Sequence, residues 1–358
     1  MKSRVAVIKT SPDTVLDDID TALKLADVEH FLNKNIPTIL KVNITWHFFY
    51  PACSTTPWQL DGVASSLRRR GHKELIPAQN RTVVINPKLG AEKNHLDSVM
   101  KKHTLTFVYL YEPDIEWINY KPKAKMLVLD KVFNGRIEIP KMFIGKNAFH
   151  LPTLKTHVFT TITGAMKNAF GGLLNDNRHW THSVIHETLV DLLQIQKEIH
   201  PGIFCLTDGT VAGNGAGPRL MEPEIKNYLL ASGDSVAIDA IAAKLMGFEP
   251  MHLKFLNLAH QKKLGTADPR EIEIVGEEIS NVNFHFRVKD TFASRGQKAI
   301  YWGKLKPFEH ILLRSRLVPW SYGASRMYHD VYWYNVYGKA RVRKFLTSAW
   351  GQLFESYK

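Results

Sequence analysis

The segment Thr38–Ile44, with the sequence TILKVNI, has the pattern of a buried β-strand, because apolar and β-branched side chains fill most of its positions. A short loop follows and leads to the sequence STTPW, in which Thr55 or Thr56 precedes Pro57. A hydroxyl residue before a proline is a favourable helix start. This strand–loop–helix unit predicts an α/β protein, and it places Lys41 near the end of a strand.

Strand and helix patterns alternate along the rest of the chain, without internal repeats. Further strands are predicted at residues 5–8, 75–77, 104–111, 125–133, 137–144, 203–206, 229–231 and 272–275, and helices at 14–26, 57–70, 183–199, 235–246 and 340–357. The alternation favours helices layered around a mostly parallel sheet. We expect an α/β domain at residues 1–280 and, at residues 281–358, a basic, aromatic-rich helical extension that packs on or over it.

The composition is that of an ordinary globular protein, with 44% hydrophobic and 23% charged residues. No apolar run reaches the roughly 18 residues that span a bilayer, and the first residues lack the apolar stretch of a signal peptide. We therefore expect a cytoplasmic protein. Its two cysteines, Cys53 and Cys205, are too few for an iron–sulfur cluster or a four-cysteine zinc site built from this chain alone.

The extension carries most of the excess charge, because residues 281–358 contain 14 Lys and Arg against 4 Asp and Glu, a net +10 of the chain's +13. It also contains many aromatic residues. This mixture suits a membrane surface, a nucleic acid or an acidic partner, with residues 285–358 as the binding region. We favour the simpler interpretation that the rings pack on the main domain while Lys and Arg remain in water. A lid over the site and a separate docking surface both fit this pattern.

The working site is predicted in the irregular stretch Phe149–Thr188, which concentrates Lys and His residues between glycines. Such long, diverse segments are often binding loops. Lys155 and His157 are two residues apart, so in an extended segment they point to the same side, where they suit a carboxylate or phosphate. The alternative is a surface Lys and a His bonded to a backbone carbonyl. Lys167 and Asn168 follow a glycine and fit either a short helix facing an anion or a solvated helix.

His182 and His186 are four residues apart at the start of a predicted helix, so both rings lie on one stripe. This spacing is typical of a helical metal pair, and it predicts an unidentified divalent metal with His157 or Asp208 as a further ligand. Histidines that pack below the surface explain the spacing equally well. His182 alone also suits a general base.

Two aspartates in the second half of the chain are candidates for the site. Asp208 follows a predicted buried strand and precedes the glycine-rich sequence GTVAGNGAGP, which we interpret as a loop that lets backbone amides approach a ligand. An Asp-Gly turn is the alternative. Asp234 is interpreted as a helix cap. Asp239 lies among closely packed alanines and needs a buried partner, for which Lys41 or Lys167 would serve.

Five pieces of the chain, in order over residues 38–250, are LKVNI, STTPW, LPTLKTHVFTTITGAMKNAFG, LTDGTVAGNGAGP and ASGDSVAIDAIAAKLMG. Together they resemble the uncharacterised family known as domain of unknown function 362, although Val42 stands where that family often has proline. The resemblance implies a shared site rather than an established activity. Many relatives carry ferredoxin-like cysteine clusters, which imply a redox role for them; this chain lacks the cysteines for such clusters.

These residues favour an enzyme whose reaction class stays open. It is expected to bind a carboxylated or phosphorylated small molecule through a set of anchoring side chains, namely Lys41, Asn43, Thr55, Thr56, Lys155, Lys167, Asn168 and Asp239. Catalysis is assigned to His157, His182 and Asp208, and a divalent metal to His182, His186 and His157. The alternative hypothesis is a non-catalytic iron–sulfur or redox accessory or cofactor carrier, which docks a redox partner protein through the basic extension. Binding of nucleic acid or a membrane surface by residues 285–358 ranks third.

Overall fold

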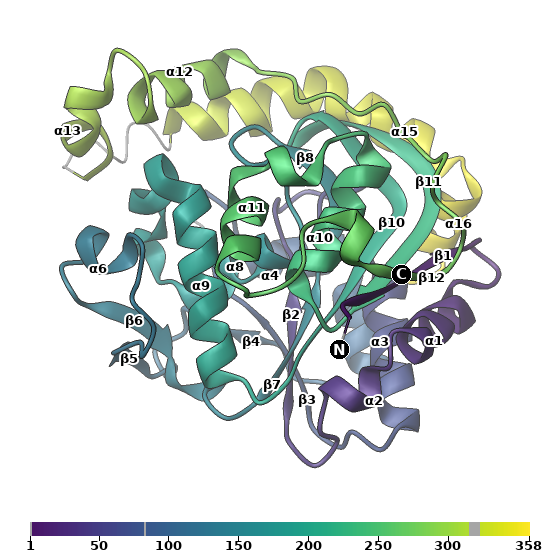
Figure 1. The fold of residues 1–358 in the computed structure, drawn as a ribbon. Helices are drawn as coiled ribbons and strands as arrows, with labels where there is room; N and C mark the ends of the chain where they lie inside the picture. Colours follow the sequence, from purple (N-terminus) through teal and green to yellow (C-terminus); the bar gives the residue numbers. More distant parts are fainter. Residues whose placement is uncertain (1, 82–83, 315–322) are drawn as a thin grey trace.

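The computed structural model describes residues 2–81, 84–314 and 323–358, and it is built around one twisted, mostly parallel sheet of ten strands (Figure 1). In spatial order, the main path contains β12 (Glu273–Gly276), β1 (Arg4–Lys9), β11 (Leu220–Ser232), β10 (Ile203–Ala216), β7 (Asn147–Leu151), β2 (Thr38–Val42), β3 (Leu75–Gln79) and β4 (Val108–Tyr109). Two further strands, β8 (Thr153–His157) and β9 (Thr161–Ile162), extend from β10. The antiparallel pairs are β1 with β11, β10 with β11, and β8 with β9.

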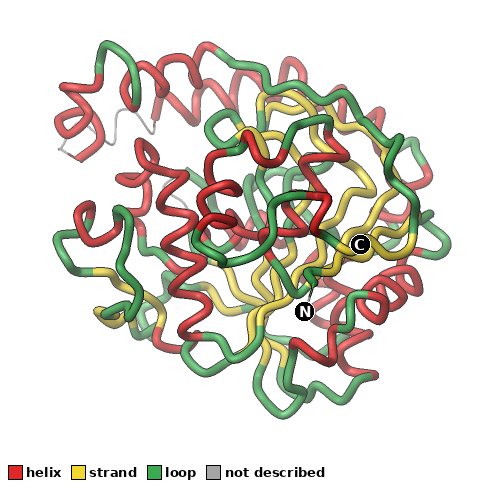
Figure 2. The backbone as a smooth tube through the Cα atoms, viewed as in Figure 1, coloured by secondary structure: helices red, strands yellow, loops and turns green. Residues whose placement is uncertain are grey.

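Helices cover both faces of the sheet (Figure 2), so the predicted layered α/β class is confirmed. The longer helices of the main domain are α1 (Val15–Leu25), α3 (Pro57–Arg69), α9 (Ile185–Ile199), α10 (Ser235–Met246) and α11 (Lys254–Gln261). Short helices are α2 (Val28–Phe31), α4 (Pro87–Lys93), α5 (Leu96–Lys102), α6 (Leu129–Val132), α7 (Ala165–Asn168) and α8 (Phe170–Leu173). Short 3₁₀ segments are η1 (Lys141–Phe143), η2 (Asp176–Val184), η3 (Pro250–His252) and η4 (Pro269–Glu271).

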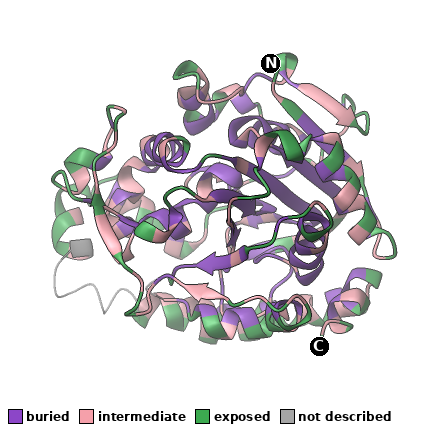
Figure 3. Ribbon diagram, turned by 90° about the horizontal axis from the view of Figure 1, so that it is seen from below, coloured by how far each residue is buried: buried purple, intermediate pink, exposed green. Residues whose placement is uncertain are grey.

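Alternate residues of the buried strands supply two hydrophobic cores, one on each face of the sheet (Figure 3). Along β1, for example, Val5 and Val7 belong to the core with α9 and α10, whereas Ala6 belongs to the core with α1 and α3. The predicted helix caps are confirmed. The Thr56 hydroxyl accepts a hydrogen bond from the Gln59 amide at 3.3 Å, and the Asp234 carboxylate accepts one from the Val236 amide at 2.8 Å.

The glycine-rich sequence after Asp208 is not a loop, and that prediction was wrong. It forms the second half of β10, which pairs with β11 as a long antiparallel hairpin. Its glycines allow close packing: a Cβ on Gly213 would lie 2.4 Å from Met221 Sδ, and one on Gly217 would lie 1.8 Å from the Thr156 carbonyl oxygen. The glycines within β10 therefore serve strand pairing.

The region between β3 and β7 also differs from the prediction. Residues 125–133 contain the short helix α6 instead of a strand, because the amides of Leu127, Val128 and Leu129 turn toward the buried Asp191 carboxylate, at 2.7 to 3.0 Å. Of residues 104–111 only β4 is extended. Residues 137–144 begin with β6 (Ile137–Pro140), which pairs with β5 (Trp117–Tyr120) in a separate two-stranded sheet.

The C-terminal extension is helical and lies along one side of the molecule, at the top and right of Figure 1. Its elements are α12 (Phe292–Tyr301), the 3₁₀ turn η5 (Lys306–Phe308), α13 (Glu309–Arg314), the π-helix η6 (Met327–Gly338), α15 (Lys339–Leu346) and α16 (Ala349–Glu355). The single helix predicted at residues 340–357 is divided in two, because Ser348 caps α16 at the Gly351 amide. Aromatic rings attach its end to the main domain: Trp350 packs on Trp58, with ring centres 5.1 Å apart. Among the described residues, no helix combines the length and apolarity needed to cross a membrane.

Candidate functional site

A cavity of about 640 Å³ lies at the carboxyl ends of β2 and β8, and α12 and η6 close it on the side of the extension. Its wall combines residues from distant parts of the chain. The basic and amide side chains among them are Lys41, Asn43, Gln79, Lys155, His157, Lys167, Asn168, Arg178, His179, His182, Arg219, Gln297 and His329. The carboxyl ends of parallel strands are where α/β proteins commonly bind ligands.

Lys41 and Lys155 are almost fully buried, each with 2% of its surface exposed. The Lys41 ammonium donates to the Val42 carbonyl and to Gln79 Oε1. The neighbouring Gly172 leaves room for its aliphatic chain, since a Cβ there would lie 2.7 Å from Lys41 Cε. The Lys155 ammonium donates to the Cys53 carbonyl and, at 2.9 Å, to Thr153 Oγ1. Both lysines are therefore held by backbone and hydroxyl oxygens at the ends of their strands.

Lys167 is held differently. Its ammonium lies 5.3 Å from the centre of the Phe170 ring and has no hydrogen-bond acceptor among the described residues. The adjacent Asn168 donates to the Lys41 carbonyl at 2.7 Å and so ties α7 to the end of β2. The ammonium group of Lys167 therefore faces the cavity, and its hydrogen-bond donors are not used by the described residues.

Burial lowers the pKa of all three lysines: that of Lys155 to about 8, that of Lys167 to about 7, and that of Lys41 well below its usual value. Neighbouring Arg178 and Lys155 lower the pKa of Lys167 further. None of the three lysines forms an ion pair with a carboxylate among the described residues. A bound anion would supply the missing counter-charge and raise these pKa values.

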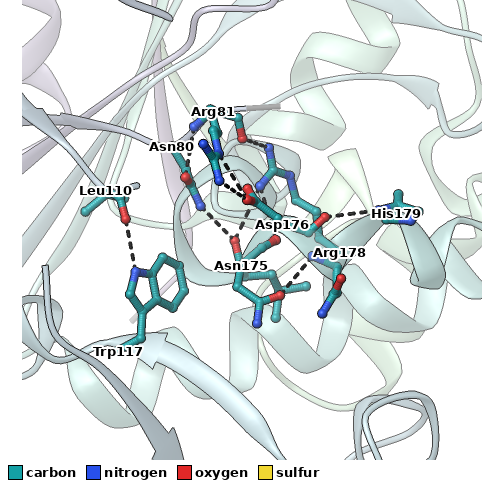
Figure 4. A network of polar contacts seen from close by, with 10 residues as sticks. Asn80, Arg81, Leu110, Trp117, Asn175, Asp176, Arg178 and His179 are labelled. Atoms are coloured by element: carbon teal, nitrogen blue, oxygen red, sulfur yellow. Dashed lines mark hydrogen bonds and ion pairs between the residues drawn. The ribbon is translucent and has the colours of Figure 1, made fainter. Parts of the chain in front are cut away.

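Asp176 is an acid that lines the cavity, and Arg81 already neutralises it through a hydrogen bond of 2.7 Å (Figure 4). Arg178 extends beside this pair and donates to the backbone carbonyls of Arg81 and Asn175, the latter at 3.2 Å. Its guanidinium is buried, with 5% of the residue exposed. The net charge facing this part of the cavity is therefore positive.

Two of the cavity histidines, His157 and His182, are fixed in opposite tautomers. His157 Nδ1 accepts hydrogen bonds from the backbone amides of Phe159 and Thr160, at 3.2 and 3.4 Å, so the neutral ring carries its proton on Nε2. His182 Nδ1 lies 2.9 Å from the His179 carbonyl, which can only accept, so this ring carries its proton on Nδ1 and has a free lone pair on Nε2. His157 is therefore a hydrogen-bond donor at Nε2, and His182 is a proton acceptor.

Both rings are neutral at physiological pH. Burial, with Lys167 next in importance, holds the pKa of His157 well below its usual value, and burial lowers that of His182 to about 3 although its backbone hydrogen bond opposes the change. His182 also stacks on Tyr301 of α12, with ring centres 5.6 Å apart and planes at 15°. The extension thus holds the ring of His182 at the cavity wall.

The predicted metal pair is not supported by a third ligand. His186 stacks on Phe255, at 6.1 Å, instead of joining His182 in the cavity lining. Within residues 2–81, 84–314 and 323–358, no three His, Cys, Asp or Glu side chains are grouped as a metal ion requires. The metal role of His182, His186 and His157 stays a prediction.

Two predicted anchors, Thr55 and Thr56, and the predicted catalytic residue Asp208 lie behind the cavity wall. Asp208 accepts hydrogen bonds from Thr56 at 2.5 Å and Trp58 at 3.0 Å, and Thr55 donates to the Leu151 carbonyl at 2.7 Å. These groups join β10, the end of β7 and the start of α3, and none of the four lines the cavity. Asn43, in contrast, lines it and accepts from the Thr45 hydroxyl at 2.9 Å.

The partner of Asp239 is the backbone and not a lysine. Its carboxylate accepts hydrogen bonds from the amides of Ala165 and Met166, at 2.6 and 3.0 Å, so the start of α7 binds this buried carboxyl group, whose pKa burial raises to about 8 although the two amides oppose the change. Gly164 is required there, because a Cβ would lie 2.3 Å from Asp239 Oδ1 and the backbone has a φ of +119°. The expectation that Lys41 or Lys167 pairs with Asp239 was wrong. Asp239 positions Lys167 by holding the helix that carries it.

The model of one protein family, described as a domain of unknown function (DUF362), matches residues 38–244, which is more than half of the chain. The chain belongs to this family. It is also 30% identical over 120 residues to a thylakoid-associated protein of Synechocystis sp. (strain ATCC 27184 / PCC 6803 / Kazusa). That match covers 32% of this chain and 36% of the cyanobacterial protein, so the chain spans about a third of the length of this relative. No solved structure gives a significant match.

The DUF362 segment contributes all the cavity cations named above, including two that the sequence prediction missed. Arg178 lies in the central stretch and Arg219 directly follows the glycine-rich strand, so nearness to those motifs was the available signal. Tyr301 and Tyr328 also line the cavity; they lie beyond the family match, in the extension for which a lid over the site was one of two interpretations.

Proposed function

We propose that this protein is an enzyme that binds a carboxylated or phosphorylated small molecule in the cavity. The observation that carries the proposal is that the buried Lys41 and Lys155 and the partly buried Lys167 line one cavity without a carboxylate partner among the described residues. Burying an unpaired cation is costly for the folded state, so burial lowers the pKa of these lysines, and a bound anion would favour their charged forms. Lys155 and Lys167 would bind the negative charge, and Asn43 and Asn168 would orient it.

The two histidines support proton transfer as the chemistry. His157 would donate a hydrogen bond from Nε2 to an oxygen of the bound ligand. His182 would accept a proton from the ligand at Nε2 once the negative charge of the ligand raises the pKa of the ring from about 3. The lysines would then stabilise negative charge that develops on the ligand. Because the rings are fixed by backbone groups, their roles do not interchange when the ligand binds.

A cytoplasmic location is part of this proposal. Cys53 and Cys205 are both buried and unpaired, as is common in reducing compartments.

The test is calorimetric titration with pyrophosphate, inorganic phosphate, sulfate and citrate, followed by phosphorylated and carboxylated metabolites. The decisive variant is Lys167→Met, because this ammonium has no hydrogen-bond acceptor in the described protein. We expect it to weaken anion binding about 10- to 100-fold, as removal of a charge-assisted hydrogen bond does. Its unliganded stability should equal or exceed that of the wild type, since a buried charge is replaced by an apolar chain of similar length.

The matched control is Lys125→Met, which removes the same charge from an exposed position. It should bind within about twofold of the wild type, as surface charges contribute little. The proposal fails if no anion, pyrophosphate included, binds the wild type, or if Lys167→Met binds as well as Lys125→Met.

A further inference from the structure

Exposed apolar side chains are concentrated in one part of the molecule. Twelve large hydrophobic residues are exposed among the described residues, and ten of them lie between residues 292 and 337. The most exposed are Phe292 at 86%, Met327 at 66% and Val331 at 64%. The other two, Ile144 and Ile225, lie in the main domain. Single exposed apolar residues are ordinary, but such a concentration marks an interaction surface.

On η6 the exposed residues share one face. In a π-helix the backbone hydrogen bonds join residue i to i+5, and one turn holds between four and five residues, so residues four or five positions apart lie on the same face. Met327, Val331 and Val336 follow this spacing and are 52–66% exposed. The opposite face is buried through Trp333, whose ring centre lies 6.1 Å from that of Trp46. The inner face thus fixes η6 to the main domain, and the outer apolar face has no partner in the described chain.

The charges around this surface have one sign. Between residues 292 and 344, the exposed charged side chains described are all basic: Arg295, Lys304, Lys306, Arg326, Lys339, Arg343 and Lys344. The two acids described there, Glu309 and Asp330, are partly buried, and Asp330 accepts a hydrogen bond from Trp46 at 2.7 Å. Apolar side chains bordered by cations are complementary to a bilayer whose headgroups are anionic.

We propose that the exposed apolar face of α12, α13 and η6, with its basic border, docks peripherally on a bilayer containing anionic lipids. Met327, Val331 and Val336 insert at the level of the headgroups, together with Phe292, Phe308 and Ile311. The cations pair with lipid phosphates. The three elements lie along the same side of the molecule, at the top of Figure 1, so one bilayer reaches all of them. A nucleic acid would use the cations but leave the apolar residues in water, and the lipid surface accounts for both.

The experiment is flotation of the full chain with vesicles of phosphatidylcholine alone and with one third phosphatidylglycerol. The wild type should float with the anionic vesicles and bind the neutral ones at least about tenfold more weakly, and added salt should reduce the binding. The variant Met327→Ser/Val331→Ser/Val336→Ser should bind anionic vesicles at least about tenfold more weakly than the wild type. Its side chains are exposed, so its unfolding temperature should match that of the wild type.

Two controls make the result specific. Ile144→Ser/Ile225→Ser removes apolar side chains of similar exposure, 41% and 48%, outside the extension and should bind like the wild type. Lys167→Met should also bind like the wild type, so that failure of the anion site and failure of membrane docking are distinguished.

Three results would overturn the proposal. The wild type stays unbound with anionic vesicles at low salt, or the serine variant floats like the wild type. In the third, sedimentation shows that the wild type is a dimer and the serine variant a monomer, which would assign the face to contact with a second copy of this chain. If the wild type does not bind anionic vesicles but binds DNA in a salt-sensitive way, and the serine variant binds DNA equally well, the basic residues would be assigned to nucleic-acid binding.

Discussion

The cavity has two halves that are built on opposite principles. The half from the sheet and α7 holds buried cations on backbone oxygens, as Lys155 is held by the Cys53 carbonyl. The half from the extension meets it through rings, as Tyr301 meets His182 and Trp302 meets Phe159, at 5.6 and 5.7 Å. Hydrogen bonds to backbone oxygens fix the positions of the charged side chains. Ring packing joins the extension to the main domain with a weaker constraint on the direction of each contact. The first half therefore suits binding and chemistry, and the second suits a cover that opens locally.

The difference between the two halves requires that buried hydrogen bonds stabilise the sheet half. The substitution Asp239→Ala is the strongest test of this requirement. The substitution leaves the amides of Ala165 and Met166 without an acceptor in a fully buried place. We expect a loss of about 2–5 kcal/mol in the free energy of unfolding, measured with urea. Asp13→Ala, at an exposed position, is the control and should change it by less than about 0.5 kcal/mol. A similarly small change for Asp239→Ala would show that α7 is held by packing alone.

The lysines of the sheet half predict how anion binding depends on pH. Their protonated forms bind the anion, and their pKa values are lowered to about 7 for Lys167 and about 8 for Lys155. Affinity for sulfate, whose charge is constant in this range, should fall at least about 100-fold between pH 6 and pH 9, because binding requires Lys167 to take up a proton and Lys155 adds to the effect. Calorimetry at both pH values measures this, and in Lys167→Met the fall should be shallower.

The same pKa values determine whether the free energy of unfolding of the unliganded protein rises or falls with pH. A lysine whose folded pKa lies below its unfolded value of about 10.4 binds fewer protons when folded. Unliganded stability from these two groups is therefore lowest below pH 7 and rises between about pH 7 and pH 10.4. Saturating sulfate should remove this rise. An affinity that is flat from pH 6 to pH 9 would mean that the anion does not contact these lysines.

Features whose cause is local could be predicted from the sequence. The cap at Thr56 follows from a hydroxyl before Pro57, and the strand end at Lys41 follows from a short apolar run. Lys155 and His157 were expected on one side of an extended segment, and β8 brings both to the cavity wall. In each case the residues that decide the conformation are neighbours in the chain.

Features decided by distant partners could not be predicted. The glycine-rich run becomes a strand because β11 pairs with it, and α6 replaces a strand because Asp191 accepts three amides from across the fold. The opposite tautomers of His157 and His182 depend on backbone groups that the loop geometry positions. The closing of the cavity by Tyr301 joins residues more than a hundred positions apart, and no local pattern carries that information.

The smallest expected effect tests whether the extension opens separately from the sheet. Trp302 donates a hydrogen bond from its ring to the Ser183 carbonyl at 2.8 Å and packs its edge on Phe159, while 45% of it stays exposed. Trp302→Ala should therefore cost at most about 1 kcal/mol, the value of one net hydrogen bond, and this cost should be confined to α12. Amide hydrogen exchange should then rise about fivefold in α12 and stay unchanged in β2. Phe292→Ala, on the same helix but 86% exposed, is the control and should leave both unchanged. Equal increases of exchange in α12 and β2 would show that the two halves unfold as one unit. The ring contacts would then couple the extension to the sheet half as strongly as the buried hydrogen bonds hold the sheet half together.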